Sequence, residues 1–387
     1  MDPARSQDCR ARRGRVPTTL ATASLVASQY SGIMPALPLD PRDRAHPLDP
    51  ATPPAAALPG LDQLLAGAHV VSLPMRVKFR GILQREALLL RGPLGWGEFG
   101  PFPEYEDAEA ARWLAAALEA GWSGFPAPLR DSIPVNATVP AVPADRVPEV
   151  LARFGRVDAV KVKVAERGQS LDDDAARVAA VREALPNAAI RVDANGGWDV
   201  AEAVTALTRL AAVGLEYAEQ PAPHIAGLAE VRRQLRASGV PVLIAADESV
   251  RKEDDPLKVA RAGAADLIVV KTAPLGGVRR ALNIVAQAGL PAVVSSALDT
   301  SVGIRAGLAL AAALPELPYA CGLGTVSLLA ADVTQDSLVP DDGAIALRDV
   351  RPAPELLAEH AASPERRDWW LDRLRRVHAV LATSTAP

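Results

Sequence analysis

Five charged residues each end a short apolar run of the chain, at similar intervals. They are Lys163, Asp193, Glu219, Asp247 and Lys271, and successive members are 24 to 30 residues apart. A buried parallel strand reads as a continuous aliphatic run, and a strand with its crossover helix needs about this length. Repeated βα units close into a barrel whose working residues lie at the carboxyl ends of the strands. The five side chains are therefore expected to meet at one rim.

The three acids of this series would supply hard oxygen ligands to a divalent cation. Asp193, Glu219 and Asp247 suit Mg²⁺, which prefers an octahedral shell of oxygen atoms, with Mn²⁺ as the alternative. The five histidines form no cluster near these acids, which argues against zinc. Asn195 is expected either to assist Asp193 or to serve only as a turn residue before two glycines.

The lysines flank these acids in the chain. Residues two apart on a strand face the same way, so Lys161 and Lys163 are both expected to point into the barrel mouth. Neighbouring ammonium groups disfavour each other's charge, which would lower the pKa of one lysine and suit it as a general base. Lys271 would enter from the opposite side, and Glu248 would order Lys271 or a ligand. A metal-bound carboxylate substrate between the lysines could then lose the proton beside its carboxylate.

A single charged residue at a strand end usually marks only the point where the strand meets solvent. A Lys-x-Lys pair, three acids and a further lysine in register are far more specific, and they indicate a catalytic site.

Composition excludes several classes of protein. The chain has 387 residues, of which 49% are hydrophobic, enough for a barrel and a smaller domain. A net charge of −4 argues against a nucleic-acid or membrane-surface partner. No apolar stretch reaches the roughly 20 residues that a membrane helix needs. Cys9 and Cys321 lie far apart, so a disulfide framework is not expected and a cytoplasmic location fits. The oligomeric state is left open.

The repeat predicts a regular alternation of strands and helices. Expected strands are 135–139, 159–163, 190–193, 215–219, 242–247, 267–271 and 292–296, with 319–324 as one more candidate. Expected helices include one capped by Ser170 and others near 199–212, 225–238, 256–262 and 276–288. The acidic run after Ser170 suits a helix start better than a metal site. Ahead of the repeat, 68–73 and 86–91 are expected as strands and 95–103 as a Gly/Pro-rich loop.

The chain divides into four parts by composition and pattern. The first is rich in arginine and then proline, typical of a disordered tail or of a start site placed too early. A β-meander followed by a helix indicates an α+β module ahead of the barrel. A terminal helix is expected to return to that module. The expected boundaries are 1–60, 61–130 for the module, 131–335 for the barrel and 336–387 for the C-terminal segment.

Several short motifs carry a resemblance to a known family. Four of them resemble motifs of the enolase superfamily, muconate-lactonizing-enzyme subgroup. They are Lys-x-Lys at 161–163, Asp-Ala-Asn at 193–195, Glu-Gln-Pro at 219–221 and Ala-Asp-Glu-Ser at 246–249. Residues 79–82, 97–102, 295–303 and 322–325 carry a narrower similarity, to the actinobacterial o-succinylbenzoate synthase family. The resemblance covers about residues 60–380 and implies a (β/α)7β barrel under a capping domain built from both chain ends.

The resemblance also implies a reaction and roles. The reaction is the syn-dehydration of 2-succinyl-6-hydroxycyclohexa-2,4-diene-1-carboxylate to 2-succinylbenzoate in menaquinone biosynthesis, by a carbon–oxygen lyase. Lys163 would remove the α-proton and protonate the leaving hydroxide, while Lys271 would stabilise the enediolate and Lys161 would tune Lys163. The substrate's succinyl side would face Arg80, Ser295 and Ser296.

Other members of the subgroup share this machinery but catalyse different reactions. With a lysine on each face of the substrate, 1,1-proton transfer is chemically open. The main alternative is N-succinylamino acid racemase activity, either in place of the dehydration or beside it. Dipeptide epimerase and muconate cycloisomerase activities are further alternatives. A non-catalytic structural metal protein would need the acids but not the lysines.

Overall fold

The computed structural model describes residues 58–79, 81–250 and 255–384. These described residues belong to one compact unit. The tail expected at 1–60 and the candidate substrate residue Arg80 lie outside the described residues, except for 58–60.

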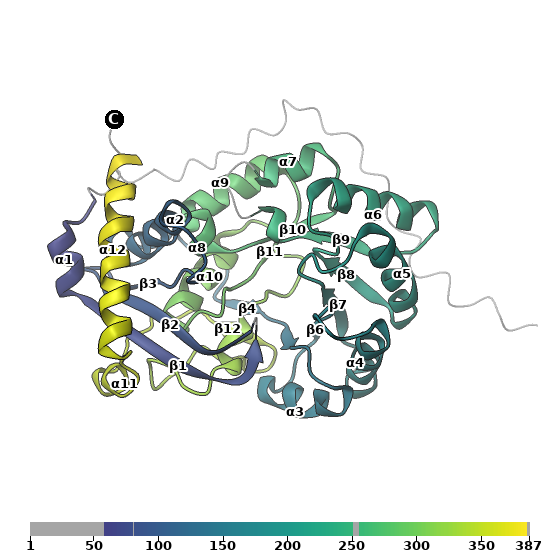
Figure 1. The fold of residues 1–387 in the computed structure, drawn as a ribbon, viewed down its shortest axis with the longest axis horizontal. Coiled ribbons are helices and arrows are strands. Elements are labelled where there is room, and N and C mark those ends of the chain that lie inside the picture. Colours follow the sequence, from purple (N-terminus) through teal and green to yellow (C-terminus); the bar gives the residue numbers. More distant parts are fainter. Residues whose placement is uncertain (1–57, 80, 251–254, 385–387) are drawn as a thin grey trace, which may run out of the picture. The chain divides into compact units, whose positions relative to one another are not determined.

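An antiparallel sheet of three strands opens the described chain, in the order β1-β2-β3 (Figure 1). Its strands are β1 (Ala68–Phe79), β2 (Ile82–Arg91) and β3 (Trp96–Phe99). The expected loop at 95–103 was therefore wrong in part, because β3 pairs with β2 from Arg91↔Trp96 to Leu88↔Phe99. Gly97 permits this strand to lie close to helix α2, since a Cβ there would collide with the main chain of Ala117.

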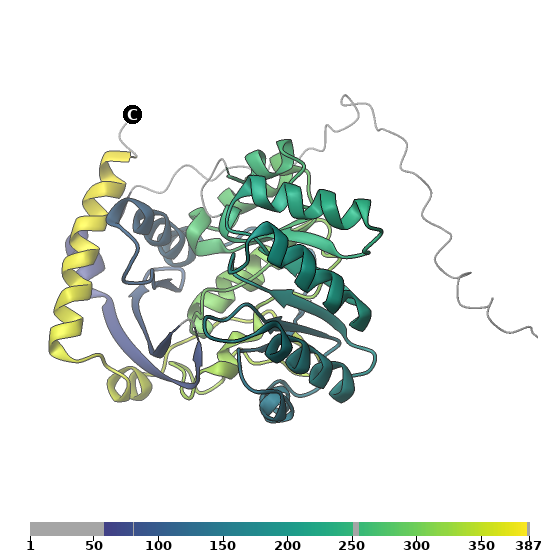
Figure 2. The ribbon, with the colours of Figure 1, turned by 45° about the vertical axis from the view of Figure 1, so that its right-hand side comes forward.

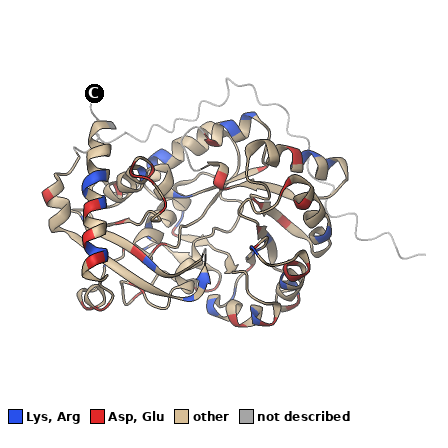
Figure 3. Cartoon of the chain, in the orientation of Figure 1, with Lys and Arg blue, Asp and Glu red and all other residues tan. Residues whose placement is uncertain are grey.

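Helices from both ends of the described chain cover this sheet. They are α1 (Leu61–Ala66), α2 (Asp107–Leu118), α11 (Pro354–Glu359) and α12 (Pro364–Ser384). Helix α12, the yellow helix of Figure 1, packs against α2 and also contacts α1 and β1. Its residues Trp370, Leu374 and Val377 recur at helical spacing and are fully buried. Figure 3 shows acidic and basic residues interspersed along the remaining faces of this helix.

A parallel sheet of seven strands, in the spatial order β11-β10-β9-β8-β7-β6-β5, forms most of the barrel. Its strands are β5 (Ala137–Val139), β6 (Ala159–Lys163), β7 (Ala189–Asp193), β8 (Leu215–Glu219), β9 (Leu243–Ala246), β10 (Leu267–Val270) and β11 (Ala292–Val294). Each of these seven predicted runs forms a strand, and no strand end differs from its predicted position by more than two residues.

A short eighth segment lies between the two edges of this sheet. Cys321 pairs in parallel with Val135 ahead of β5, and Gly322 pairs in parallel with Ser295 after β11. Main-chain bonds from Asn136 N to Cys321 O, at 2.9 Å, and from Gly322 N to Val294 O, at 2.8 Å, complete the junction. The described residues therefore form the predicted (β/α)7β barrel, with its last strand reduced to two residues.

The crossover helices surround the strands on the outside (Figure 2). They are α3 (Val147–Leu151), α4 (Leu171–Ala184), α5 (Val200–Leu210), α6 (Ile225–Ala237), α7 (Asp255–Arg261), α9 (Val278–Ala288) and α10 (Ser301–Ala313). Ser170 and Asp173 form a capping box at the start of α4, so the acidic run there begins a helix as predicted.

The remaining elements are short. A two-stranded antiparallel ladder joins β4 (Ser132–Pro134) to β12 (Ala344–Ala346), and α8 (Thr272–Leu275) follows β10. Single turns of 3-10 helix lie at Ala144–Arg146, Ala152–Phe154, Ala211–Val213, Glu248–Val250 and Gly324–Leu328, and a π-helical turn at Glu119–Ser123. None of the described helices is both long and apolar enough to cross a membrane.

Candidate active site

The parallel register places the charged strand ends beside one another. Lys163 on β6 is the partner of Asp193 on β7, and Asp193 is the partner of Glu219 on β8. Because adjacent strands lie about 4.8 Å apart, charges in register on three strands must interact directly. These three side chains lie at the same level of the barrel, as the sequence predicted.

Lys161 lies one pleat deeper than Lys163 and is almost fully buried, at 7% exposure. Its Nζ donates to both carboxylate oxygens of Glu219 at 2.9 Å and lies 3.4 Å from Asp193 Oδ2. Burial disfavours its charged form, but Glu219 and Asp193 outweigh burial and raise the pKa of Lys161. Lys161 is therefore not the lysine of the pair whose pKa is lowered, because two buried acids lie beside its ammonium group.

The acids respond to the same cluster in opposite ways. Burial and the nearby charge of Asp193 raise the pKa of Glu219 to about 8. The pKa of Asp193 is lowered, because Lys163 and Lys161 together outweigh its burial. Negative charge is thus crowded around Glu219 even with a lysine bound to it.

Lys163 is held at its ammonium group by two oxygen atoms. Its Nζ donates to Asp193 Oδ2 at 2.5 Å and to Asn195 Oδ1 at 2.7 Å. Asn195 has a left-handed backbone (φ 48°) and its amide donates to Glu248 Oε1 at 3.1 Å. Asn195 is thus a turn residue and a partner of the site at once, and Glu248 contacts it directly.

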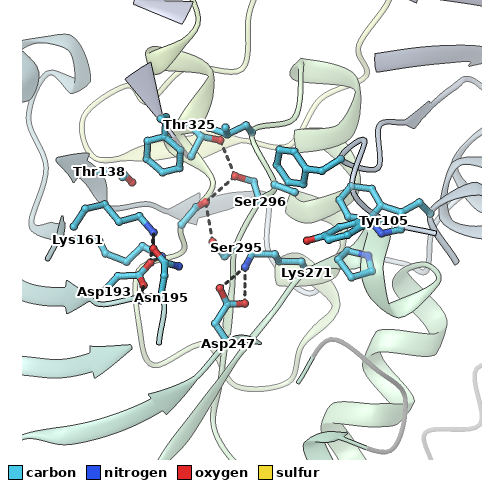
Figure 4. Close-up of a pocket in the computed structure, with 18 residues that line it drawn as sticks. Tyr105, Thr138, Lys161, Asp193, Asn195, Asp247, Lys271, Ser295, Ser296 and Thr325 are labelled. Carbon is cyan, nitrogen blue, oxygen red and sulfur yellow. Dashed lines mark hydrogen bonds and ion pairs between the residues drawn. The ribbon is translucent and has the colours of Figure 1, made fainter. Parts of the chain in front are cut away.

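Asp247 and Lys271 form the other half of the rim (Figure 4). Lys271 Nζ lies 2.5 Å from each carboxylate oxygen of Asp247. The Asp247 main chain is held by Gln220, whose Oε1 accepts from Asp247 N at 2.9 Å and from Ser249 N at 3.2 Å. Gln220 belongs to the Glu-Gln-Pro motif, but no role was predicted for it; its position directly after Glu219 was the available signal.

One pocket brings nearly all the predicted residues together. Its lining includes eight of them: Lys161, Lys163, Asp193, Asn195, Asp247, Lys271, Ser295 and Ser296. Glu219 and Glu248 lie behind this lining, bonded to Lys161 and Asn195 respectively.

The hydroxyl side of the pocket includes residues that the sequence analysis missed. Ser296 Oγ lies 2.6 Å from Thr325 Oγ1 and donates to Gly322 O at 3.2 Å. Ser295 is almost fully buried beside the same carbonyl, at 3.5 Å. Thr138 on β5 and Thr325 both line the pocket. Thr325 stood within a quoted motif, whereas no sequence signal distinguished Thr138.

Four aromatic side chains from the N-terminal part of the chain form an aromatic wall of the pocket. They are Phe79, Phe102, Tyr105 and Trp113. Phe102, Tyr105 and Trp113 pack on one another with ring centroids 5.9 to 6.4 Å apart. The Phe79 ring centroid lies 5.3 Å from Lys163 Nζ. Figure 4 shows Tyr105 across the pocket from Lys161.

The donor set fits a hard divalent cation. Asp193, Glu219 and Asp247 are buried carboxylates with 1 to 3% exposure, which is costly unless a cation compensates them. Within the described part of the chain, no three acidic, histidine or cysteine side chains are arranged to hold a metal ion as they stand. Each carboxylate is paired with a lysine ammonium instead. The three carboxylates therefore have the ligand chemistry that a hard divalent cation requires. In this structure lysine ammonium groups neutralise their charge.

Family models match both parts of the chain. Residues 144–352 match the enolase C-terminal domain-like family, and residues 70–121 match the enolase N-terminal domain-like family. A muconate lactonizing enzyme from Pseudomonas fluorescens has a similar fold, with a TM-score of 0.65 at 22% identity over 76% of this chain and 98% of that one. The fold and the rim of acids and lysines thus define an enolase-like protein.

Curated relatives narrow this class. The o-succinylbenzoate synthase of Mycolicibacterium smegmatis is 58% identical over 325 residues, covering 84% of this chain and 99% of the relative. The o-succinylbenzoate synthase of Mycobacterium tuberculosis is 55% identical over 328 residues, covering 84% and 98%. The chain belongs to the o-succinylbenzoate synthase family of the enolase superfamily. Membership of this superfamily implies a divalent metal cofactor.

Proposed function

We propose that this protein dehydrates 2-succinyl-6-hydroxycyclohexa-2,4-diene-1-carboxylate to 2-succinylbenzoate, as a hydro-lyase of menaquinone biosynthesis. Relatives that carry the name of this activity are 55 to 58% identical over most of the chain. The observation that carries the proposal is the rim itself: lysines from β6 and β10 enter one pocket beside three buried carboxylates. A binding module would gain nothing from lysines that cost so much to bury.

Lys163 is the proposed base. As the free amine it takes the proton from the ring carbon that bears the carboxylate. The electron pair then forms the ring double bond as the C–O bond to the neighbouring hydroxyl breaks. The ammonium of Lys163 gives its proton to the leaving oxygen, so one water molecule is released and the amine is restored. Asn195 holds Nζ during both transfers.

Lys271 and Lys161 have electrostatic roles in this proposal. Lys271, from a different strand, supplies positive charge to the carboxylate oxygens as negative charge develops on them. Lys161 stays charged, because Glu219 and Asp193 hold its pKa above the usual range. It therefore favours the free amine of nearby Lys163.

Asp193, Glu219 and Asp247 are the proposed ligands of Mg²⁺, with Mn²⁺ as the alternative. A bound divalent cation would supply positive charge that stabilises the substrate carboxylate as it becomes an enediolate. Gln220 and Asn195 orient these ligands from behind. Asn195 N donates to Asp193 Oδ1 at 3.0 Å, and Gln220 fixes the main chain of Asp247.

The remaining predictions complete the proposal. Ser295, Ser296 and Arg80 would contact the substrate's succinyl side. The partner is a small-molecule carboxylate, with no nucleic acid or membrane, and a cytoplasmic location remains a prediction from cysteine usage. The division into 61–130, 131–335 and 336–387 is supported by the packing of α12 against α2.

The test is a spectrophotometric assay of the cyclohexadiene carboxylate with Mg²⁺. Lys163→Ala should reduce kcat by at least about 100-fold, because it removes both proton transfers. Lys258→Ala is the matched control, since Lys258 is exposed on α7 and, among the described residues, forms an ion pair with Asp255. Turnover that survives in Lys163→Ala would contradict the assignment of the base, and an inactive wild type would contradict the dehydration.

A second activity is favoured by one specific observation. Lys163 and Lys271 reach the pocket from different strands, so a proton removed by one lysine can be returned by the other. We propose N-succinylamino acid racemisation as the alternative or additional reaction, ahead of dipeptide epimerase or muconate cycloisomerase activity. The check is deuterium incorporation at the α-carbon of N-succinyl amino acids in D₂O. Its absence in the wild type would rule the racemisation out.

A further inference from the structure

Two of the four side chains of the aromatic wall come from one loop. Residues 100–105 connect β3 to the segment before α2, and they supply Phe102 and Tyr105 to the pocket. Within the loop, Tyr105 N donates to Phe102 O at 3.1 Å. Loops of this kind are commonly mobile unless other parts of the protein hold their main chain. The hydrogen bonds that its carbonyl groups accept therefore determine how mobile the loop and its two rings are.

Arg85 on β2 holds the first part of this loop. It is 2% exposed, and its Nη2 donates to Gly100 O at 2.6 Å. Its guanidinium carbon lies 4.8 Å from the Phe102 ring centroid, so the cation also supports the ring from behind. Nε of the same side chain donates to Leu298 O at 3.0 Å, and Leu298 lines the pocket from the barrel side.

Arg373 on α12 holds the rest of the loop. It is 1% exposed and donates from Nη1 to Pro101 O at 3.2 Å and from Nη2 to Phe102 O at 3.2 Å and to Tyr105 O. Burial lowers the pKa of Arg373, so its position is unfavourable for a cation. The forked donors of this one guanidinium group serve three carbonyls of the loop, which no other side chain reproduces.

We propose that Arg85 and Arg373 are positioning residues that together clamp loop 100–105 and so fix the substrate-facing rings of Phe102 and Tyr105. Four carbonyls of a six-residue loop accept from these two guanidinium groups. Hydrogen bonds to carbonyls specify the path of the main chain, and the path determines where the rings point. The clamp links the C-terminal helix to the active site through Arg373.

The kinetic effect that we expect of the clamp rests on the proposed function. Tyr105 lies across the pocket from Lys161 (Figure 4). We expect the rings of Phe102 and Tyr105 to contact parts of the substrate that do not react. Contacts of this kind bind the ground state and the transition state equally, so loosening them raises KM and leaves kcat nearly unchanged. We expect Arg373→Met and Arg85→Met each to raise KM for the cyclohexadiene carboxylate about tenfold, with kcat within about threefold of wild type.

Arg130→Met is the matched control. Arg130 also donates to main-chain carbonyls, those of Ala311 at 2.6 Å and Leu314 at 2.7 Å, but at the end of α10 away from the pocket. It should lower thermal stability without changing KM. An equal rise of KM in Arg130→Met would mean that any lost arginine loosens the site, and would overturn the clamp.

A double variant separates a positioning role from a general loss of stability. In a background of Phe102→Ala with Tyr105→Ala, both rings that Arg373 positions are absent, so adding Arg373→Met should change KM by less than about twofold. Effects that simply multiply would overturn the proposal. If Arg373→Met does not fold, Arg373→Lys is used in its place, because one ammonium cannot serve three carbonyls.

Hydrogen–deuterium exchange gives a readout that needs no substrate. In the unliganded protein, the amides of Phe102, Glu104 and Tyr105 should exchange at least about tenfold faster in Arg373→Met than in wild type or Arg130→Met. Unchanged exchange would overturn the clamp even if the wild type were inactive. Faster exchange in a protein that lacks dehydratase activity would support the clamp and contradict only the proposed function.

Discussion

At the scale of single residues, Gln220 joins two strand ends of the active site. It is fully buried with a left-handed backbone (φ 41°), and its amide donates to Ala222 O at 2.8 Å and Ser249 Oγ at 2.9 Å. Gln220→Ala leaves the Asp247 and Ser249 amides without this acceptor. We expect unfolding free energy, measured with urea, to fall by roughly 1–3 kcal/mol. Metal affinity should fall as well, because Asp247 loses its anchor.

Gln84→Ala is the control for this prediction. Gln84 is exposed, and its Oε1 accepts a long hydrogen bond of 3.5 Å from Ser72 Oγ. It should leave both stability and metal affinity unchanged. Equal stability of Gln220→Ala and wild type would show that water replaces the lost acceptor.

At the scale of elements, Arg191 holds the two-residue strand that closes the barrel. Arg191 is 1% exposed inside the barrel; it donates to Ala320 O and Asn136 Oδ1, and its Nε lies 2.6 Å from Glu216 Oε2. Its guanidinium carbon lies 4.9 Å from the Tyr217 ring centroid. A strand of two residues has few ladder bonds of its own, so this side chain supplies much of its attachment.

Arg191→Leu should therefore destabilise the protein by roughly 1–3 kcal/mol, the usual cost of leaving a buried acceptor such as Asn136 Oδ1 without its donor. Amide exchange at Cys321 and Gly322 should accelerate ahead of the rest of the barrel. Arg209→Leu, which breaks an exposed pair with Asp172, should change neither measurement. Uniform acceleration across all strands would contradict a local role.

At the scale of the whole molecule, Glu86 joins the N-terminal sheet to the C-terminal helix. It accepts from Arg366 Nη2 at 2.7 Å and from Trp370 Nε1 at 2.9 Å. Burial alone would raise the pKa of Glu86, but the hydrogen bonds from Arg366 and Trp370 outweigh it and lower the pKa. Because the pKa is lower in the folded state, this contact stabilises folding above the ordinary glutamate value of 4.5 and is lost as pH falls below it.

Glu86→Gln should thus be less stable than wild type at pH 7, and the difference should narrow as the pH falls below 4.5. Urea unfolding at several pH values is the measurement. Glu166→Gln, at an exposed loop position of the barrel, should match wild type throughout. A difference that widens toward acid would contradict the assignment.

Much of the fold and the site could be predicted because parallel strands have simple rules. Side chains alternate along a strand, and strand ends meet at one edge, so the Lys–Asp–Glu–Asp–Lys series placed its members at one rim without reference to any contact. Ser170 could likewise be predicted as a helix N-cap, because capping depends on residues that are close in the sequence. The short motifs then gave the family, which the relatives confirm.

The sequence alone determined the order of the barrel strands, their charged ends and the class of chemistry, since these depend on periodicity and residue type. Tertiary structure alone decided which lysine pairs with which acid, and hence the raised pKa of Lys161. It also placed β3, reduced the closing strand to two residues and brought Arg85 and Arg373 to one loop. These features join residues up to some 270 positions apart. No local pattern encodes such pairs, because they form only when packing brings distant segments into contact.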